Sequence, residues 1–99
     1  MARKKGRIFV VSAPSGGGKT TVCNRLRRGG LGLEYSVSAT TRPPRSNERN
    51  GRDYIFMDKR EFNRMKARKK FLEWTNNFGD LYGTPARPVR EALSKGRDV

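Results

Sequence analysis

A glycine-rich loop that directly follows an apolar strand constrains this chain more than any other feature. The strand is the β-branched run Ile8–Val11, and a helical segment over residues 19–28 comes after the loop. Consecutive glycines let successive backbone N–H groups turn inward, and the helix aims its positive end at the same point. The pattern is that of a phosphate-binding loop, made of Ala13, Pro14, Ser15, Gly16, Gly17, Gly18, Lys19 and Thr20.

Two side chains of this loop have chemistry suited to a nucleotide. Lys19 can reach the outer phosphates, and the Thr20 hydroxyl can ligate Mg²⁺. Ala13 stands where the usual pattern has glycine, so the match is imperfect. The alternative is a glycine-rich turn with a solvated lysine, and the agreement of strand, loop and helix argues against it.

The composition favours an anionic partner. Among 99 residues, 23 Lys and Arg against 9 Asp and Glu give a net charge of +14. The single cysteine excludes an internal disulfide. Because the chain also has no histidine, a zinc site is not expected. No run is apolar for long enough to cross a membrane, and no secretory signal is visible, so we expect a cytoplasmic protein without membrane contacts.

The remaining pattern predicts an α/β fold with a small β-rich region. Residues 7–12 should form a buried parallel strand, and residues 19–28 the first helix. Asp58 can cap a helix over 59–68, and Thr84 can cap another that begins at Pro85 and ends at Gly96. We expect further strands or extended segments at 35–38, 54–57, 71–74 and 81–83.

Only one strongly apolar parallel strand is visible, and the apolar fraction is only 33%. Residues 97–99 read as the approach to another strand. We therefore expect the N-terminal portion of a longer protein with a parallel sheet. Edges left exposed by missing strands are expected to allow self-association.

A second constellation follows residue 36. Arg42 and Arg45 lie three residues apart, with hydroxyl residues before them and Tyr54 after them. Arginine binds phosphate in a bidentate way that lysine cannot match, so this segment is a candidate second anion site. A solvated basic loop is the alternative reading of the same residues. Trp74 is predicted to be a packing residue.

With both constellations in view, the chain closely resembles the guanylate kinase family. The segments A-P-S-G-G-G-K-T, S-V-S-A-T-T-R-P-P-R, G-R-D-Y-I-F, F-L-E-W and L-Y-G-T-P occur in the family's order and spacing. The resemblance extends over nearly the whole chain from Ile8. Asn47 departs from it, since the family usually has glycine there before the glutamate.

The resemblance implies a fold, a reaction and a set of roles. The fold would be a P-loop NTPase-type parallel sheet with core residues 1–34, a GMP-binding subdomain over 35–84, and a helix returning to the core over 85–99. The reaction would transfer the γ-phosphate of MgATP to GMP. Residues 13–20 and Thr21 would hold the ATP phosphates, with Thr20 on the metal, and Lys19, Arg42 and Arg45 would be catalytic. GMP would be held by Ser38, Arg42, Arg45, Tyr54, Glu73, Tyr82 and Thr84.

The family's chains are about twice as long, so the resemblance also implies that residues 1–99 alone are inactive. Two other functions compete with this one. Guanylate-kinase-like scaffold domains bind phosphopeptides, but they have no need of Lys19. A nucleic-acid-binding module would explain the charge, yet no recognition motif for a specific nucleic acid is present.

Overall fold

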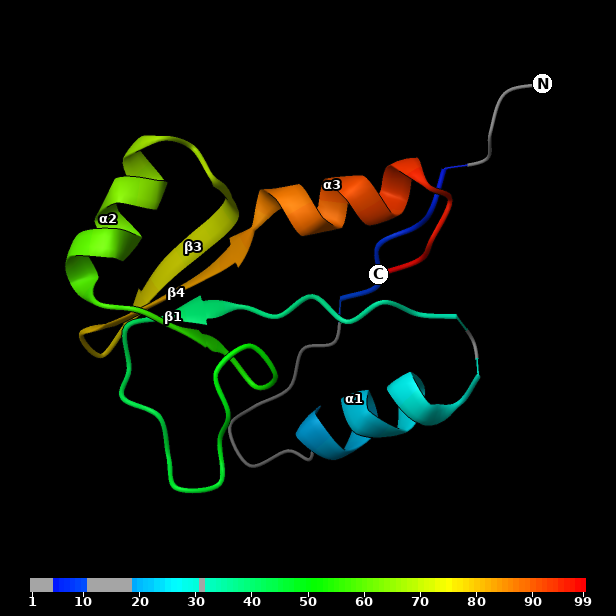
Figure 1. Ribbon diagram of the computed structural model, residues 1–99, viewed down its shortest axis with the longest axis horizontal. Coiled ribbons are helices and arrows are strands. Elements are labelled where there is room, and N and C mark those ends of the chain that lie inside the picture. The colour runs from blue at the N-terminus through cyan, green and yellow to red at the C-terminus, as the bar shows by residue number, and fades with distance from the viewer. Residues whose placement is uncertain (1–4, 11–18, 31) are drawn as a thin grey trace. The chain divides into compact units, whose positions relative to one another are not determined.

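The computed structural model describes residues 5–10, 19–30 and 32–99. They form two compact units, Met1–Tyr35 with Val89–Val99, and Ser36–Pro88. The elements along the chain are α1 (Lys19–Arg28), β1 (Ala39–Thr40), β2 (Ile55–Phe56), α2 (Lys59–Ala67), β3 (Phe71–Asn77), β4 (Asp80–Pro85) and α3 (Ala86–Ser94) (Figure 1). Helices together with a mixed sheet confirm the predicted α/β class.

The unit of residues 36–88 is built on a four-stranded sheet in the order β2-β1-β4-β3. β1 runs parallel to β2 and antiparallel to β4, and β4 forms an antiparallel hairpin with β3. The hairpin turn contains Gly79 at φ 88°, a backbone angle that glycine adopts without strain. The predicted extended segments around Gly79 are therefore both strands, longer than expected from the sequence.

One face of this sheet is covered by α2. The Phe62 ring from the helix stacks on Phe71 of β3 with centroids 4.5 Å apart, and Phe62 has no exposed surface. Gly83 of β4 lies under both rings. A Cβ at position 83 would come within 2.8 Å of the Phe71 ring, so only glycine leaves room for this packing.

The ends of α2 follow from its sequence. An Asp58 carboxylate oxygen accepts a hydrogen bond from the Glu61 N–H at 2.8 Å, which satisfies one of the free donors at the first turn. The predicted cap and the predicted helix over 59–68 are thus confirmed, with α2 covering Lys59–Ala67. The chain leaves the helix through Lys69, at φ 56°.

In the other unit the first helix is confirmed, since α1 covers Lys19–Arg28. The predicted buried strand over 7–12 is wrong for the residues that the structure describes. Residues 7–10 have no strand assignment, and Ile8, Phe9 and Val10 are 52%, 57% and 84% exposed. A parallel strand is buried only where neighbouring strands and helices cover both its faces. Two backbone hydrogen bonds join this segment to Val99. The Phe9 N–H donates to the Val99 carbonyl at 2.7 Å, and the Val99 N–H donates to the Arg7 carbonyl at 2.9 Å.

Three local predictions also need correction. β1 begins at Ala39, so residues 35–38 are not a strand. Thr84 and Pro85 belong to β4, and α3 begins only at Ala86, so Thr84 does not cap that helix. Trp74, on the edge strand β3, is 45% exposed instead of packed, and the Lys66 ammonium of α2 lies 4.1 Å from its ring centroid.

In the last helix, Val89 and Ala92 are buried, at 4% and 3% exposed. Gly96, at φ 79°, donates its N–H to the Leu93 carbonyl and ends this segment as expected. Within residues 5–10, 19–30 and 32–99, no helix combines the length and the apolar character needed to span a bilayer.

Candidate functional site

The strand register places most of the candidate GMP residues on one face of the sheet. Gly83 faces α2, so its neighbours Tyr82 and Thr84 lie on the opposite face. Glu73 is paired with Thr84, and Thr40 is paired with both Tyr82 and Phe56, which extends this face across all four strands. By the same alternation two further residues fall on this face. Ser38 directly precedes β1, and Tyr54 directly precedes β2. We call this surface the site face.

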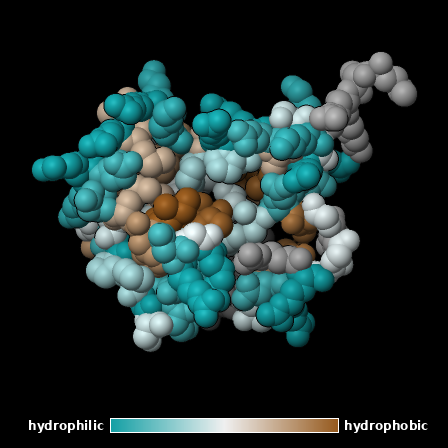
Figure 2. Space-filling model, viewed as in Figure 1, coloured by the Kyte–Doolittle hydropathy of each residue, from teal (hydrophilic) through white to brown (hydrophobic). Residues whose placement is uncertain are grey.

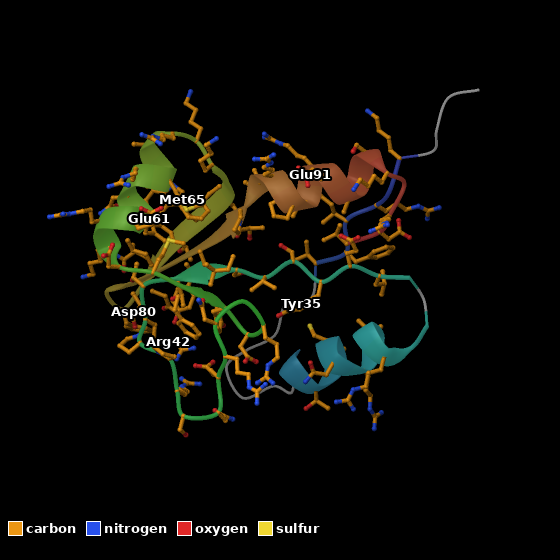
Figure 3. The ribbon with its side chains drawn as sticks, viewed as in Figure 1. Tyr35, Arg42, Glu61, Met65, Asp80 and Glu91 are labelled. Carbon is orange, nitrogen blue, oxygen red and sulfur yellow. The ribbon has the colours of Figure 1, made fainter. Side chains whose placement is uncertain are left out.

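Arg42 leaves the sheet at the end of β1, and its guanidinium is held by Glu48. Nη1 and Nη2 donate to Oε1 and Oε2 of the carboxylate, both at 3.0 Å, and Nη1 also donates to the Pro43 carbonyl at 3.1 Å. Both side chains of the pair are 14% exposed. Such a bidentate pair fixes the plane of the guanidinium as well as its position. Figure 3 shows Arg42 in the loop beside the sheet.

Glu48 also organises the backbone around Arg45. Its Oε1 accepts the Arg45 N–H at 2.8 Å, and the Glu48 N–H donates to the Arg45 carbonyl at 3.0 Å. The turn over 45–48 is therefore closed from both ends by one residue. The Arg45 guanidinium is exposed. This turn holds the backbone of Arg45 in place and leaves its side chain available to a ligand.

Two tyrosines line the site face next to Arg42. The guanidinium carbon of Arg42 lies 5.3 Å from the centroid of the Tyr54 ring, and the Tyr54 and Tyr82 rings meet edge to face at 6.1 Å. The arrangement combines a cation, two aromatic walls and two phenol groups. Three residues of one loop segment, Arg42, Glu48 and Tyr54, thus form a cluster with Tyr82, which is distant in the sequence.

The ion pair between Arg42 and Glu48 stabilises the charged form of both side chains. The hydrogen bonds that Arg42 donates to Glu48 raise the pKa of Arg42, burial acts in the opposite direction, and Tyr82 raises the pKa further. The pKa of Glu48 is lowered by the hydrogen bonds from Arg42 and from the Arg45 backbone. Arg42 therefore stays a cation and Glu48 an anion at every physiological pH.

A second pair lies on the site face, between Glu73 of β3 and Thr84 of β4. The Thr84 hydroxyl donates to Glu73 Oε1 at 2.6 Å across the β3–β4 hairpin. Because the Thr84 proton is directed to Oε1, Glu73 Oε2 and the lone pairs of Thr84 remain as acceptors. A ligand edge that presents N–H donors matches this pair.

The remaining predicted site residues are described more sparsely. Ser38 is half-buried just before β1, and its carbonyl accepts the Ile55 N–H at 2.8 Å. Thr21 is exposed in the first turn of α1. Residues 13–18 lie outside the described part of the chain, and for Lys19 and Thr20 only the helical backbone is described.

Glu48 is the residue that sequence reasoning missed. In the sequence Glu48 stands out only as the glutamate that follows Asn47. A signal was present, since it is an acid within the basic loop over 42–52, three residues after Arg45. What the sequence could not reveal is that the loop folds back so that this acid meets Arg42 and not Arg49 or Arg52.

The site face carries a guanidinium at one end and a carboxylate–hydroxyl pair at the other, which is chemistry suited to a small polar ligand of the nucleotide type. The guanylate kinase family model matches residues 5–99, and the chain belongs to that family. It is 50% identical over 95 residues to the guanylate kinase of Carboxydothermus hydrogenoformans, covering 96% of this chain and 47% of the relative. It is 52% identical over 96 residues to that of Rhodopseudomonas palustris, covering 97% and 44%.

A solved structure agrees with this result. The crystal structure of guanylate kinase from Anaplasma phagocytophilum matches with a TM-score of 0.81 and 35% identity, over 98% of this chain and 47% of that one. The chain therefore spans about half the length of the curated relatives and of the solved structure that it matches.

Proposed function

We propose that this chain carries the GMP site and the ATP phosphate loop of an enzyme that transfers the γ-phosphate of MgATP to GMP. The observation that carries the proposal is the site face, where Arg42 with two tyrosines and Glu73 with Thr84 come from different strands onto one surface. An anion subsite and a carboxylate subsite on a common surface are what a nucleoside monophosphate requires.

The Glu73–Thr84 pair is proposed to read the base. Guanine presents adjacent N1–H and N2–H₂ donors, and the free acceptor capacity of Glu73 can take both. Adenine presents no such donor pair on that edge. Ser38, on the same face, is assigned to the same subsite. Base selectivity then follows from the cost of leaving a carboxylate oxygen without its partner.

Arg42, Arg45, Tyr54 and Tyr82 are proposed to hold the GMP phosphate. Arg42 is already oriented by Glu48, so little freedom is lost when phosphate binds. Arg45 supplies a second guanidinium from the adjoining turn. The two arginines would neutralise the acceptor phosphate, which lets two anionic reactants approach each other.

Residues 13–20 and Thr21 are proposed to hold the ATP phosphates, with Lys19 on the outer ones. Thr20 would supply the protein oxygen for Mg²⁺, which neutralises phosphate charge and generally keeps only one or two protein ligands beside nucleotide oxygens. The transfer itself is in-line between the two nucleotides and needs no covalent enzyme intermediate.

Calorimetric titration of the 99-residue chain with GMP, AMP and a phosphopeptide tests the binding proposal. We expect GMP to bind and the other two to bind at least tenfold more weakly, about 1.4 kcal/mol or more. Equal affinity for GMP and AMP would overturn the base subsite, and preference for the phosphopeptide would favour a scaffold function.

The transfer reaction is proposed for a whole enzyme of the length of the relatives, and residues 1–99 alone are proposed to turn over poorly. A coupled assay of ADP release with MgATP and GMP measures this directly. Turnover by the 99-residue chain at the rate of a full-length relative assayed alongside would refute the second proposal while supporting the first.

A further inference from the structure

The helix α2 carries a row of arginines that the proposed GMP site does not use. Arg60, Arg64 and Arg68 recur every four residues, and all three are exposed. The Arg68 N–H donates to the Arg64 carbonyl at 3.1 Å, so the helical spacing continues to the last of them. Neighbours in such a row are about 6 Å apart along the axis. We call these three residues the arginine stripe.

The surroundings of the stripe are strongly basic. Segment 58–70 contains seven Lys and Arg residues against Asp58 and Glu61. Arg64 pairs with Glu61 at 3.4 Å, but its side chain is still 55% exposed. Figure 3 shows nitrogen-tipped side chains projecting outward from α2, and in Figure 2 hydrophilic residues gather over this part of the surface.

This arrangement works against the stability of the helix. Like charges four residues apart repel each other, and Lys59 and Arg60 stand at the end where the helix dipole disfavours cations. The Asp58 cap and the Glu61–Arg64 pair act in the opposite direction. A row of cations that costs helix stability points to an anionic partner that offsets the repulsion when bound.

An aromatic ring lies beside the basic end of α2. The Lys66 ammonium, in the last turn, sits 4.1 Å from the centroid of the Trp74 ring, and Trp74 remains 45% exposed. Trp74 pairs with Gly83 in the sheet, so it is on the α2 side and not on the site face. Lys66 is therefore the cation beside the indole, whereas the stripe lies on the side of α2 that faces away from the buried Phe62. An exposed indole at the flank of a basic helix supplies the two elements that bind a single strand, which are contacts to its phosphates and one stacked base.

An anionic lipid surface fits these residues less well. A helix that lies in a membrane inserts an apolar face. Of the two large apolar residues of α2, Phe62 is fully buried against Phe71 and cannot insert, and Met65 is half-buried. The outward face instead combines the stripe with Asn63 and Ala67, both exposed.

We propose that the α2 surface, through Arg60, Arg64 and Arg68 with Trp74, binds single-stranded nucleic acid without sequence preference. The stripe follows the strand's phosphates, and a base stacks on the exposed part of the indole. This surface is on the opposite side of the sheet from the site face, so it is separable from GMP binding.

Titration of the 99-residue chain with a short oligothymidylate tests this proposal. Trp74 is the single tryptophan of the chain, so its fluorescence reports stacking without a label. We expect quenching by the single strand, little quenching by a duplex, and an affinity that falls steeply with salt. The triple variant Arg60→Gln, Arg64→Gln, Arg68→Gln should bind at least tenfold more weakly and flatten the log–log salt slope by about 2.

A matched control removes the same charge elsewhere. Arg25→Gln, Arg28→Gln, Arg90→Gln changes three exposed arginines of the other compact unit and should leave binding within about threefold at fixed salt. Both variants should keep the GMP affinity of the unmodified chain, which separates this test from the proposed function.

Three results would overturn the proposal. They are equal weakening by the control variant, equally tight binding of the duplex without quenching, and tighter binding to phosphatidylserine vesicles with a blue shift of Trp74 emission. If circular dichroism shows that the triple variant does not fold, the salt dependence of binding by the unmodified chain tests the proposal instead. A log–log salt slope shallower than about −1 would then rule out the stripe as a phosphate-binding row.

Discussion

Arg42 and Glu48 form a two-pronged ion pair in which each terminal nitrogen of the guanidinium meets one carboxylate oxygen at 3.0 Å. The same carboxylate accepts the Arg45 N–H. One acid therefore orients the first candidate phosphate ligand and anchors the backbone of the second. The pair orders this part of the candidate site in the absence of a ligand.

Glu48→Gln should make the free energy of unfolding depend less on pH in the acidic range. Because Arg42 lowers the pKa of Glu48 below its unfolded value of about 4.3, this carboxylate stabilises the folded state above that pH. The contribution is lost as the pH falls through the lower, folded pKa. Urea unfolding at a series of pH values should show the difference between wild type and variant shrinking in acid. A constant difference would contradict the stabilising role of this ion pair.

Arg45→Lys tests whether the exposed guanidinium binds phosphate. The substitution keeps the charge and removes the fork, so GMP affinity should fall by about 1–3 kcal/mol while stability stays unchanged. Calorimetric titration with GMP measures the effect. Arg49→Lys, another exposed arginine of the same loop, is the matched control and should leave GMP affinity unaltered. Equal affinities for wild type and Arg45→Lys would remove Arg45 from the phosphate subsite.

Glu73→Gln should reduce selectivity for the base more than affinity for the phosphate. The amide turns an acceptor oxygen into a donor that faces guanine N–H groups, at an expected cost of about 1–3 kcal/mol for GMP. The affinity for AMP should change little. Competition between GMP and AMP on the same preparation gives the ratio. A ratio equal to that of wild type would mean that Glu73 does not read the base.

Gly83→Ala should destabilise the sheet unit. The new methyl group would lie 2.8 Å from the Phe71 ring and 3.1 Å from Phe62, so the rings must shift at a cost of about 1–3 kcal/mol. Chemical denaturation measures the change. Asn63→Ala, at an exposed position of α2, is the control and should stay within about 0.5 kcal/mol of wild type. An unchanged midpoint for Gly83→Ala would show that α2 packs differently.

Loss of the helix cap provides a test of the α2 boundary. Asp58→Ala removes the acceptor of the Glu61 N–H and should cost about 1 kcal/mol of unfolding free energy. Asp58→Asn keeps an acceptor and should recover most of it. Thermal unfolding followed by circular dichroism distinguishes the two variants, and equal losses would indicate that charge at the helix start matters more than the cap hydrogen bond.

The amino-acid sequence alone determined the features that depend on neighbouring residues. The limits of α1 and α2, the Asp58 cap, the turn at Gly79 and the glycine that ends the last helix follow from local backbone preferences and short-range hydrogen bonds. The identity of the family followed from motifs whose spacing the sequence displays directly.

Tertiary structure alone decided what depends on strand register and loop path. It aligned Tyr82, Thr84 and Glu73 on one face, turned Thr84 from an expected helix cap into the partner of Glu73, and brought Glu48 to Arg42. It also left Ile8, Phe9 and Val10 exposed, although their composition predicts burial. The physical reason is the same throughout. A one-residue slip reverses the face of every side chain in a strand, and burial depends on neighbours that are distant in the sequence.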